Sequence, residues 1–451
     1  MTTALIVLAA GKGTRMKSDL PKVLHPIAGA PMLVHALRAG AALEPGRIAV
    51  VTGHGAEAVE AAALEHDEDI RCVRQTEQLG TAHAVAQART ALEGVEGDAL
   101  VLYGDTPFIR PETLERMIEA RRTHDVVVLG FDAADPGRYG RLIMDGAALE
   151  RIVEFKDASN EERAVTFCNS GVIAADCATL FDLIDAVDNQ NAAGEYYLTD
   201  IIAIARARGL AATAIACDEA ETLGVNSRAE LAAAEALFQA RVRAQAFEDG
   251  VILQAPQTVH FAYDTAIGPD TLIEPNVVFG PGVTIENGAH IRAFSHLEGC
   301  HVSSGAIVGP YARLRPGAEL GEDARVGNFV EIKNAVLGTG AKVNHLTYIG
   351  DADLGAACNV GAGTVTCNYD GVMKHQTHIG AGAFIGSGTM LVAPVRVGDG
   401  ALTGSGSVIT QDVPDGALAM GRARQVNKTG FASKLFDMLR AEKAKRDKGA
   451  S

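Results

Sequence analysis

Residues 266–297 read AIGPDTLIEPNVVFGPGVTIENGAHIRAFSHL, and an aliphatic or aromatic side chain recurs among them at every sixth position. A period of six residues, with glycine or another small residue beside the apolar one, is typical of a parallel β-helix of hexapeptide repeats. Each repeat forms one side of a triangular coil, and its apolar side chain points inwards. Chance does not explain so many positions in phase. They are Ile267, Ile273, Phe279, Ile285, Ile291, Leu297, Val308, Leu314, Leu320, Val326, Ile332, Leu337, Val343, Ile349, Leu354, Val360, Ile379, Ile385, Leu391, Val397, Thr403 and Ile409.

Four breaks interrupt this period, near residues 302, 337, 354 and 366–378. The longest, 366–378, exceeds one side of a coil, so we expect it to leave the coil as a loop. Loops that interrupt a regular scaffold commonly carry function. We therefore expect chemistry in the coils around this loop.

The first half of the chain, up to about residue 227, has a different rhythm. Short apolar runs alternate with stretches of helical character. This alternation predicts a Rossmann-like α/β domain with a mostly parallel sheet and helices on both faces. The expected strands lie at 5–8, 48–51, 99–103 and 125–129, and the expected helices at 56–64 and from Pro111 onwards.

The two halves are joined by residues 228–249, which are rich in Ala, Leu and Glu and contain no Gly or Pro. This composition predicts one continuous helix. We therefore expect an α/β domain at 1–227, a helical linker at 228–249 and a β-helix domain with a C-terminal tail at 250–451. In the tail, apolar residues at 435–439 have helical spacing, and a basic end follows at 443–451.

Composition excludes several classes of protein. The formal net charge of −16 argues against non-specific nucleic-acid binding, which needs a basic surface. The seven cysteines are scattered and form no C-x-x-C pair, which argues against a disulfide framework and a zinc site. A reducing compartment fits, and we expect a cytoplasmic protein. No apolar run is long enough to span a membrane, and the N-terminus resembles a first strand more than a signal peptide.

A glycine loop, LAAGKGTRM at 8–16, follows the first expected strand. Small residues let the backbone approach a ligand closely, and successive N–H groups can point at phosphate oxygens. Arg15 and Lys22 supply cations for a phosphate. The spacing fits neither the P-loop nor the dinucleotide fingerprint, since Met16 stands where that fingerprint needs a third glycine. By itself, such a loop also fits a plain tight turn.

The segment YGD at 103–105 ends an apolar strand, which places Asp105 at the carboxyl edge of the sheet. Open α/β sheets bind ligands at this edge. The carboxylate is suited to Mg²⁺, although an aspartate that caps a turn would give the same pattern. Further polar segments are QTEQLGTAH at 75–83, YGR at 139–141, VEFK at 153–156, NSG at 169–171, EYYLTD at 195–200 and GVN at 224–226.

Together these segments resemble the sugar-nucleotide pyrophosphorylases, most closely the N-acetylglucosamine-1-phosphate uridylyltransferases. LAAGKGTRM, DLPKVLH, QLGT and YGD occur in the family's order and spacing. The resemblance implies Mg²⁺-dependent transfer of a uridylyl group from UTP to N-acetylglucosamine 1-phosphate, with release of pyrophosphate. Such an in-line attack needs mainly positioning and charge neutralisation. Ala82 departs from the pattern, because many relatives have Gly there.

The resemblance also implies roles for single residues. Asp105 and Asn226 are expected to hold Mg²⁺, and Arg15 and Lys22 to neutralise the phosphates during catalysis. The expected binding residues for UDP-N-acetylglucosamine are Leu8, Ala9, Ala10, Gly11, Lys22, Gln75, Gly80, Thr81, Tyr103, Gly104, Asp105, Gly140, Glu154, Asn169 and Asn226.

Polar residues also gather within a few coils of the expected β-helix. One coil advances by only about 4.8 Å, so residues about 18 apart stack on one face. His345 is a candidate general base, because imidazole can take the proton of an amine that attacks a thioester. Arg315 and Lys333 are candidates for binding a sugar phosphate. Nothing here requires a covalent intermediate, so we expect direct attack and no nucleophilic role for Cys367.

This half resembles the hexapeptide-repeat acyltransferases. The whole chain, over about residues 3–425, resembles the bacterial bifunctional N-acetylglucosamine-1-phosphate uridylyltransferase / glucosamine-1-phosphate N-acetyltransferase family. The motifs are RLRPGA, VGNFVE, HLTY, NVGAGT and TCNYDG. The resemblance implies a left-handed β-helix, a homotrimer with acetyl-CoA bound between subunits, and supply of precursors for peptidoglycan and lipid A.

In this resemblance His345 is the general base of the acetyl transfer. Two departures are Asn344, where a Gly is common, and Ser405, where an Ala is common. The residues implied for glucosamine 1-phosphate are Arg315, Lys333, Tyr348 and Asn359, and those implied for acetyl-CoA are Ala362, Asn368, Tyr369, Ser387, Ser405 and Arg422.

Two other functions fit the same sequence. In the first, the chain is a single-activity sugar-phosphate uridylyltransferase whose β-helix serves only assembly. In the second, it is a sugar-nucleotide sensor without turnover. The two-activity prediction requires both Asp105 and His345 to be essential, each for its own reaction.

Overall fold

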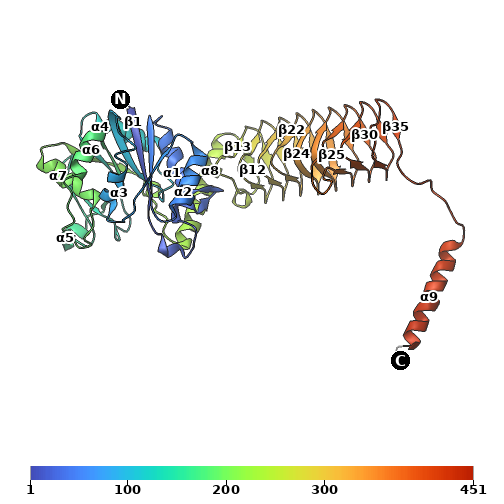
Figure 1. The fold of residues 1–451 in the computed structure, drawn as a ribbon, viewed down its shortest axis with the longest axis horizontal. Helices are drawn as coiled ribbons and strands as arrows, with labels where there is room; N and C mark the ends of the chain where they lie inside the picture. The colour runs from blue at the N-terminus through green and yellow to red at the C-terminus, as the bar shows by residue number, and fades with distance from the viewer. Residues whose placement is uncertain (1, 450–451) are drawn as a thin grey trace. The chain divides into compact units, whose positions relative to one another are not determined.

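The structure is a computed structural model that describes residues 2–449 (Figure 1). The chain forms two compact units. The first contains the residues up to Glu248 together with His260–Thr265, and the second contains Asp249–Val259 and the residues from Ala266 on. Met1 and the last two residues of the expected basic end lie outside the described residues.

The first unit is built on a twisted sheet with the strand order β11-β7-β10-β6-β1-β4-β5. All neighbours in this order are parallel except β10, which runs antiparallel to β6 and β7. The strands are β1 (Thr2–Ala9), β4 (Arg47–Thr52), β5 (Arg71–Arg74), β6 (Gly97–Tyr103), β7 (Val126–Asp132), β10 (Phe167–Asp176) and β11 (Ala212–Cys217), with β8 (Arg141–Asp145) and β9 (Ala148–Val153) as a side hairpin and β2 (Pro26–Ile27) and β3 (Ala30–Pro31) as a small separate pair.

Helices cover both faces of this sheet, and the central strand shows why. Leu5 and Val7 of β1 face one apolar cluster, and Ile6 faces the other, because side chains alternate along a strand. The α-helices are α1 (Met32–Ala41), α2 (Ala56–His66), α3 (Thr81–Gln87), α4 (Pro111–Arg121), α5 (Asn160–Arg163), α6 (Cys177–Ile184), α7 (Ile201–Ala207) and α8 (Arg228–Glu248). The prediction of a Rossmann-like sheet with helices on both faces is confirmed.

The helix α8 (Arg228–Glu248) is continuous, but it is more than a connection. Ala234 is fully buried in a cluster with Ile27 and Met32 of the first unit. Gln239 is also buried, and its side-chain amide pairs in both directions with the backbone of Phe261, at 2.7 and 2.9 Å. The sequence gives no sign that His260–Thr265 returns to the first unit, because this segment lies within the part expected to be β-helix.

The second unit is a triangular coil of short parallel strands, the β-helix that the six-residue period predicts (Figure 1). Its strands form three faces. One face contains β12 (Ile252–Leu253), β14 (Leu272–Ile273), β17 (His290–Ile291), β20 (Ile307–Val308), β23 (Arg325–Asn328), β25 (Lys342–His345), β27 (Asn359–Val360), β30 (Phe384–Ile385), β33 (Leu402–Thr403) and β35 (Leu418–Ala419). The other two share a sheet of β13 (Ala266–Ile267), β15 (Val278–Phe279), β16 (Thr284–Ile285), β18 (His296–Leu297), β19 (Cys300–Val302), β21 (Arg313–Leu314), β22 (Ala318–Leu320), β24 (Glu331–Leu337), β26 (Tyr348–Leu354), β28 (Val365–Cys367), β29 (Thr377–Ile379), β31 (Met390–Val392), β32 (Val395–Val397) and β34 (Val408–Ile409).

The recurring side chains fill the interior of this coil. Every in-phase position expected to point inwards is buried except Ile267, which is partly exposed near the start of the coil. Thr403 is the one polar member, and its hydroxyl accepts the N–H of Gly386 at 2.9 Å. The apolar interior and the hydrogen-bonded ladders therefore stabilise each coil through its neighbours.

The loop expected at 366–378 is shorter than predicted. Thr366 is buried in β28, where its hydroxyl donates to Gly350 O at 3.1 Å and accepts that residue's N–H at 2.8 Å. Thr377 is buried at the start of β29. The Thr366 hydroxyl bonds to the preceding coil, which lets this threonine replace an aliphatic residue inside. The Thr377 hydroxyl is buried without a hydrogen-bond partner among the residues that the structure describes. Only about 368–376 leave the coil.

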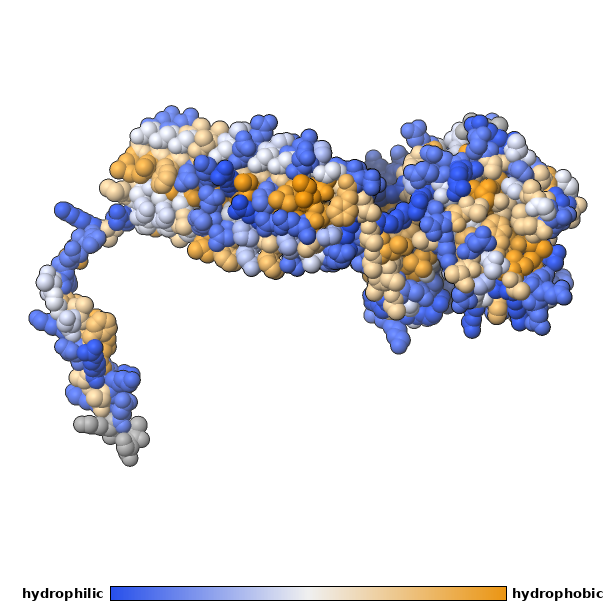
Figure 2. All heavy atoms as spheres, turned by 180° about the vertical axis from the view of Figure 1, so that it is seen from behind, coloured by the Kyte–Doolittle hydropathy of each residue, from blue (hydrophilic) through white to orange (hydrophobic). Residues whose placement is uncertain are grey.

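The tail forms one helix, α9 (Phe431–Gly449), whose apolar residues are exposed. Orange and blue residues lie side by side along it in Figure 2. The helical spacing expected for Leu435, Phe436, Met438 and Leu439 is confirmed. No helix within residues 2–449 has the length and apolar character needed to cross a membrane.

Candidate active sites

A cavity of about 320 Å³ lies where β1 and β6 of the first unit end. Its lining brings together most of the residues expected to hold the nucleotide. Those residues are Leu8, Ala10, Gly11, Lys22, Gln75, Gly80, Thr81, Tyr103 and Asp105. Ala9 does not line it, because alternation along β1 turns this residue into the apolar cluster on the opposite face.

Lys22 joins the two expected metal ligands. Its ammonium contacts the Asp105 carboxylate and donates a 3.0 Å hydrogen bond to Asn226 Oδ1. The loop that carries Asn226 is fixed to the same strand end, because Val225 N–H donates to Asp105 O at 3.0 Å. One ammonium group and two oxygen atoms that could bind a metal, from three distant parts of the chain, therefore meet at one point.

Two glycines make this meeting sterically feasible. Gly13 has a φ of +57°, and a Cβ there would overlap the side chain of Lys22. Gly80 has a φ of +121°, and a Cβ there would run into the backbone of Tyr196. Both conformations favour glycine. Gly11, in contrast, has open space where its side chain would stand, which leaves its backbone accessible from the cavity.

The residues expected to face the sugar form a second group. Asn169 N–H donates to Gly140 O at 2.8 Å, and a Cβ on Gly140 would lie 3.5 Å from Glu154 Oε1. Burial raises the pKa of Glu154, which accepts a 3.3 Å hydrogen bond from the Thr199 hydroxyl. Glu154 also lines a cavity of about 400 Å³ with Arg138, Phe155, Lys156 and Tyr197.

Tyr103 links the two groups electrostatically. Burial raises the pKa of its phenol, and the negative charges of Asp105 and Glu154 raise it further. Its ring occupies the space that a side chain at Gly171 would need. The nucleotide cavity and the sugar group therefore both lie near this ring.

Two expected residues have other surroundings. Arg15 is exposed on a short 3-10 helix, Thr14–Met16, and is not among the residues that line the cavity. Gly104 lies against Val23 and Leu33, and its N–H donates to Leu8 O at 2.9 Å, so it serves the packing of β6 on β1.

Gln78 and Glu195 line the same cavity and were not expected. The Gln78 amide donates to Ala10 O at 2.9 Å, which closes the glycine loop over the cavity. Gln78 lies inside the QTEQLGTAH segment, and this position was the only sign in the sequence that it could belong to the site. Glu195 opens the EYYLTD segment at 195–200, which was noted as part of the resemblance without a role for this residue.

In the second unit, His345 is exposed at the end of β25. Its Nδ1 lies 2.9 Å from Asn328 Oδ1, one coil earlier. Since an amide oxygen only accepts, this contact selects the tautomer that carries its proton on Nδ1. The Nε2 lone pair of His345 is then left available as a base.

A backbone ladder leads from His345 along one corner of the coil. Gly363 N–H donates to His345 O at 3.2 Å. On the next two coils, Gly388 N–H donates to Ala362 O at 2.7 Å and Gly406 N–H donates to Ser387 O at 2.8 Å. Ser405 directly precedes the donor of the last rung, Gly406. His345, Ala362, Ser387 and Ser405 therefore occupy one column on successive coils, and a Cβ on Gly406 would lie 3.9 Å from the side chain of Arg422.

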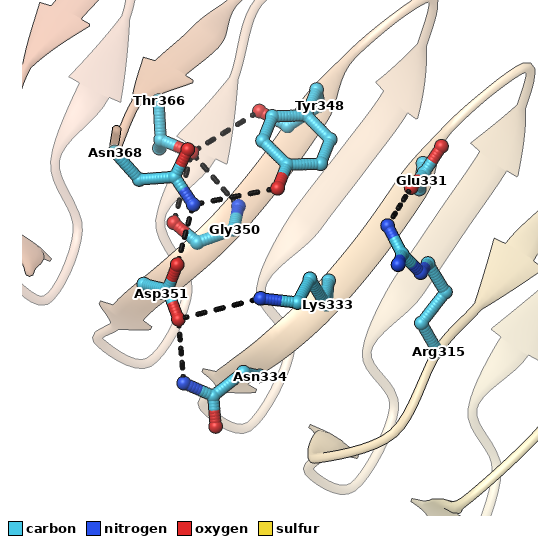
Figure 3. Close-up of polar contacts among 9 residues, drawn as sticks. All are labelled: Arg315, Glu331, Lys333, Asn334, Tyr348, Gly350, Asp351, Thr366 and Asn368. Atoms are coloured by element: carbon cyan, nitrogen blue, oxygen red, sulfur yellow. Dashed lines mark hydrogen bonds and ion pairs between the residues drawn. The ribbon is translucent and has the colours of Figure 1, made fainter. Parts of the chain in front are cut away.

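A polar cluster on a neighbouring face centres on Asp351 (Figure 3). Its buried carboxylate accepts from Asn334 at 2.7 Å and from Asn368 at 2.5 Å, and lies 3.8 Å from the Lys333 ammonium. Burial raises the pKa of Asp351, but these hydrogen bonds and the lysine charges outweigh burial and lower it. Asn368 also reaches the Tyr348 hydroxyl at 3.4 Å.

Other expected residues lie around this cluster. Arg315 pairs with Glu331 at 2.8 Å, as Figure 3 shows. Tyr369 is 61% exposed and donates to Gly371 O at 2.6 Å within the projecting loop. Asn359 pairs in register with Lys342, on the face that contains His345.

Lys374 belongs to this region and was not expected. Its pKa is lowered by the hydrogen bond and the positive charge of Lys333, and Asp351 opposes this effect. The two ammonium groups of Lys333 and Lys374 therefore lie near the Asp351 carboxylate, while Arg315 pairs with Glu331. Lys374 lies in the projecting loop, where no periodic pattern marks it.

His345 is not in contact with this cluster. Its side chain contacts Asn328, and the Thr347 hydroxyl donates to its backbone carbonyl. His345 and Tyr348 are close in sequence, but no hydrogen bond joins their side chains within residues 2–449. A single copy of the chain presents the imidazole and the cationic cluster as separate groups.

Exposed apolar residues continue the corner column on the other side of His345. Phe294, Tyr311 and Phe329 stack with ring centroids 4.9 and 5.3 Å apart, and Leu346 follows. All four have a φ between +49° and +60°, a strained conformation for a bulky residue. Each is about half exposed or more. Hydrophobic residues reach the surface of this unit in patches (Figure 2).

Comparison with known proteins agrees with this architecture. Residues 5–171 match the MobA-like NTP transferase domain, and residues 264–299 and 376–411 match the bacterial transferase hexapeptide family of six repeats. The hexapeptide match accords with the left-handed β-helix that the resemblance implied.

Full-length relatives are also similar. The bifunctional protein GlmU of Ruegeria pomeroyi is 71% identical over 448 residues, which cover 99% of this chain and 100% of the relative. The proteins of the same name from Ruegeria sp. and Roseobacter denitrificans are 69% and 67% identical, with complete coverage of both chains. At this identity and coverage, the chain belongs to the bifunctional GlmU family.

Proposed function

We propose that the chain catalyses two consecutive reactions. In the second unit, an acetyl group passes from acetyl-CoA to the amine of glucosamine 1-phosphate. In the first unit, the resulting N-acetylglucosamine 1-phosphate attacks UTP to give UDP-N-acetylglucosamine and pyrophosphate. The observation that carries this proposal is the presence of two separate polar centres, one around Lys22 and one around His345, each within its own unit.

The cavity around Lys22 supports the uridylyl transfer. Backbone N–H groups at the open Gly11 and the ammonium of Lys22 neutralise the triphosphate, and Gln75 and Gln78 keep the loops that enclose it in place. Glu154 and Asn169 form hydrogen bonds with the sugar hydroxyls, as acceptors and donors. Tyr103 excludes water between the two groups. These residues hold the attacking phosphate in line with the α-phosphorus.

The pair Asp105 and Asn226 fits a magnesium ion. Both turn an oxygen towards one cationic group, the Lys22 ammonium, and carboxylate and amide oxygens are the ligands that Mg²⁺ prefers. The ion, when bound, neutralises phosphate oxygens of the nucleotide. Asp105 and Asn226 would hold it, and Lys22 would then be free to turn to the phosphates.

The corner column around His345 supports the acetyl transfer. Asn328 holds the imidazole with Nε2 as the base, so that it removes the proton from the sugar amine as nitrogen attacks the thioester carbonyl. The thiolate of coenzyme A then leaves. Burial raises the pKa of Cys367, which disfavours a thiolate nucleophile there and supports direct attack.

The remaining residues are assigned to the two substrates of this reaction. Lys333, Arg315 and the added Lys374 bind the phosphate, while Tyr348 and Asn359 contact the sugar. Asp351 keeps Lys333 oriented. Acetyl-CoA lies along the column, with Ala362, Ser387, Ser405 and Arg422 on the coil, and Asn368 and Tyr369 at the base of the projecting loop.

We further propose a homotrimer, in which the column of one copy meets the cationic cluster of another. Two observations support this: His345 is apart from the cluster within one copy, and Phe294, Tyr311 and Phe329 form an exposed strained ladder beside it. Burying such rings against other copies offsets the cost of exposing them. Changing Phe329 to Asn, which tolerates a positive φ, should dissociate the assembly in sedimentation, whereas the exposed Phe384→Asn should not.

A single assay tests the whole proposal. Purified protein receives glucosamine 1-phosphate, acetyl-CoA, UTP and Mg²⁺ together, and each component is omitted in turn. We expect UDP-N-acetylglucosamine only in the complete mixture. Free coenzyme A should be released even when UTP is omitted. Turnover of N-acetylglucosamine 1-phosphate with UTP but no acetylation would leave a single-activity uridylyltransferase. No turnover in either reaction would leave a sensor.

A further inference from the structure

A groove separate from both proposed centres lies on the first unit. Its volume is about 460 Å³, larger than the nucleotide cavity. One wall is α1, with His35 and Arg38, and another is α8, with Phe238, Arg241, Val242 and Gln245 at helical spacing. The segment 107–111 at the start of α4 and Tyr263 of the returning segment complete it. A volume in this range suits a small molecule.

The charges in this groove are unusual for an acidic chain. Arg38, Arg110 and Arg241 line it, and no Asp or Glu of the described chain does. Arg110 lies 3.7 Å from Asp218 and 3.9 Å from Glu221, which only loosely offset its charge. Neither Arg38 nor Arg241 forms an ion pair within residues 2–449. The lining is therefore positive, although the formal net charge of the chain is −16.

The guanidinium groups are held in place by aromatic rings. Arg38 stacks over Tyr263, 4.9 Å from the ring centroid, and Arg241 over Phe108 at 5.8 Å. Arg241 also donates to Phe108 O at 3.4 Å. Burial lowers the pKa of Arg241, and repulsion by the like charge of Arg110 lowers it further, while the carboxylates of Glu221, Asp218 and Glu112 only partly oppose these effects. An anion between Arg110 and Arg241 would relieve this repulsion.

The returning segment is built to keep the groove in shape. Gln239, one helical position from Phe238, clamps Phe261, and Tyr263 N–H donates to Ala28 O at 2.9 Å. Tyr263 and Phe238 each place an edge against the His35 ring, at 6.1 and 5.6 Å. The aromatic floor is thus pre-formed, and the three arginines are exposed at the rim.

We propose that this groove binds a small phosphorylated compound that carries a planar or apolar ring. The phosphate lies among Arg38, Arg110 and Arg241, and the ring packs on Phe108, Phe238 and Tyr263. The site is distinct from the nucleotide cavity and the sugar group, since it shares no residue with either. The inference goes beyond the two proposed reactions and does not depend on them.

The test uses the absence of tryptophan from the chain. A Tyr263→Trp variant of the full-length protein gives one fluorophore inside the groove. Titration with phenyl phosphate should change its emission saturably, while phenol should not. Adding Arg241→Ala should weaken the binding by at least about tenfold, since a guanidinium–phosphate contact is lost. The matched control is Arg122→Ala at the other end of α4, exposed and outside the groove, which should leave the affinity unchanged.

Equilibrium dialysis of phenyl phosphate against the unaltered chain and against Arg38→Ala and Arg241→Ala provides a second measurement. We expect each substitution to lower the number of phenyl phosphate molecules bound per chain by one. The inference is overturned if emission does not saturate and dialysis shows no lost equivalent, or if affinity is the same with and without Arg241. Both proposed activities, measured on the same preparations, report separately on the substrate sites.

Discussion

The two units assemble their polar centres from very different distances along the chain. In the first unit, Lys22 and Asn226 are 204 residues apart in sequence and 3.0 Å apart in space. In the β-helix, Asn328 and His345, or Asn334 and Asp351, are 17 residues apart. The first centre therefore depends on the whole α/β domain, whereas the second depends on a few adjacent coils.

The same contrast appears in how each unit uses glycine. In the first unit, Gly13 and Gly80 allow two distant segments to approach each other. At the corner of the β-helix, Gly363, Gly388 and Gly406 repeat one turn on successive coils. A change in the first centre should thus spread through its unit, while a change in the second should remain local and leave the other reaction intact. Four measurements test this difference.

The largest effect is expected for His345→Ala. Loss of the base should reduce acetyl transfer by about 10²- to 10⁴-fold, with uridylyl transfer unchanged in the same preparation. The control is His301→Ala, which removes another exposed histidine of the coil, one that pairs with Glu286. Equal losses in both activities would mean that the two centres are not independent.

A smaller but still large loss is expected for Asp105→Ala. Removing the carboxylate that faces Lys22 should lower uridylyl transfer by about 10²- to 10³-fold and leave acetyl transfer intact. The comparison variant is Asp145→Ala, at the exposed last residue of β8. If Asp105→Ala keeps full turnover, the role assigned to this strand end is wrong.

A moderate effect is expected for Lys374→Ala. This substitution should raise the KM for glucosamine 1-phosphate about tenfold with little change in kcat, because one of several phosphate contacts is lost. Lys342→Ala, on a different face of the coil, is the control. A fall in kcat without a change in KM would argue against phosphate binding by this lysine.

The smallest effect concerns stability and pH. Burial raises the pKa of Glu154 above its ordinary value of 4.5, so the folded state favours the protonated carboxyl. The contribution of the protonated Glu154 carboxyl to folding stability is fully present below the pKa of this group in the unfolded chain. It is lost as pH rises through its pKa in the folded chain. Glu154→Gln, which is always neutral, should therefore raise the Tm of the first unit at pH 7 by on the order of 2 °C.

The same Glu154→Gln variant should show little gain in Tm near pH 4, and a higher KM for N-acetylglucosamine 1-phosphate at pH 7. Glu150→Gln is the comparison, since Glu150 is on the same strand but forms an ion pair with Arg206. A gain in Tm that is equal at both pH values would contradict the assignment to burial.

Much of the fold follows from local pattern. The six-residue period identifies the inward side chains of the coil, because every coil repeats the same packing. The error lies at the projecting loop, where Thr366 and Thr377 are polar yet buried. Hydrophobic periodicity cannot reveal that the Thr366 hydroxyl is satisfied by the backbone of the preceding coil, nor that the Thr377 hydroxyl is buried without a hydrogen-bond partner in the described part of the chain.

The polar centres were predicted less evenly. Asp105, Lys22 and Asn226 stand in segments with a recognisable pattern, and the structure brings them together. Gln78, Glu195 and Lys374 are contributed by loops, whose partners depend on the tertiary fold and not on spacing. Ala9 shows the opposite problem, since a residue inside a recognised motif faces the core by strand alternation. The roles of all these residues stay predictions until the variants are measured.

The corner column has one more consequence. From His345 to Ser405 it climbs three rungs, each set by the coil pitch of about 4.8 Å, and so covers roughly 14 Å. In the proposed arrangement, this length sets how far an elongated acyl donor reaches when its reactive end lies at the imidazole. Inserting a single coil between these rungs would lengthen the column by about 4.8 Å, without altering any residue assigned to the substrate.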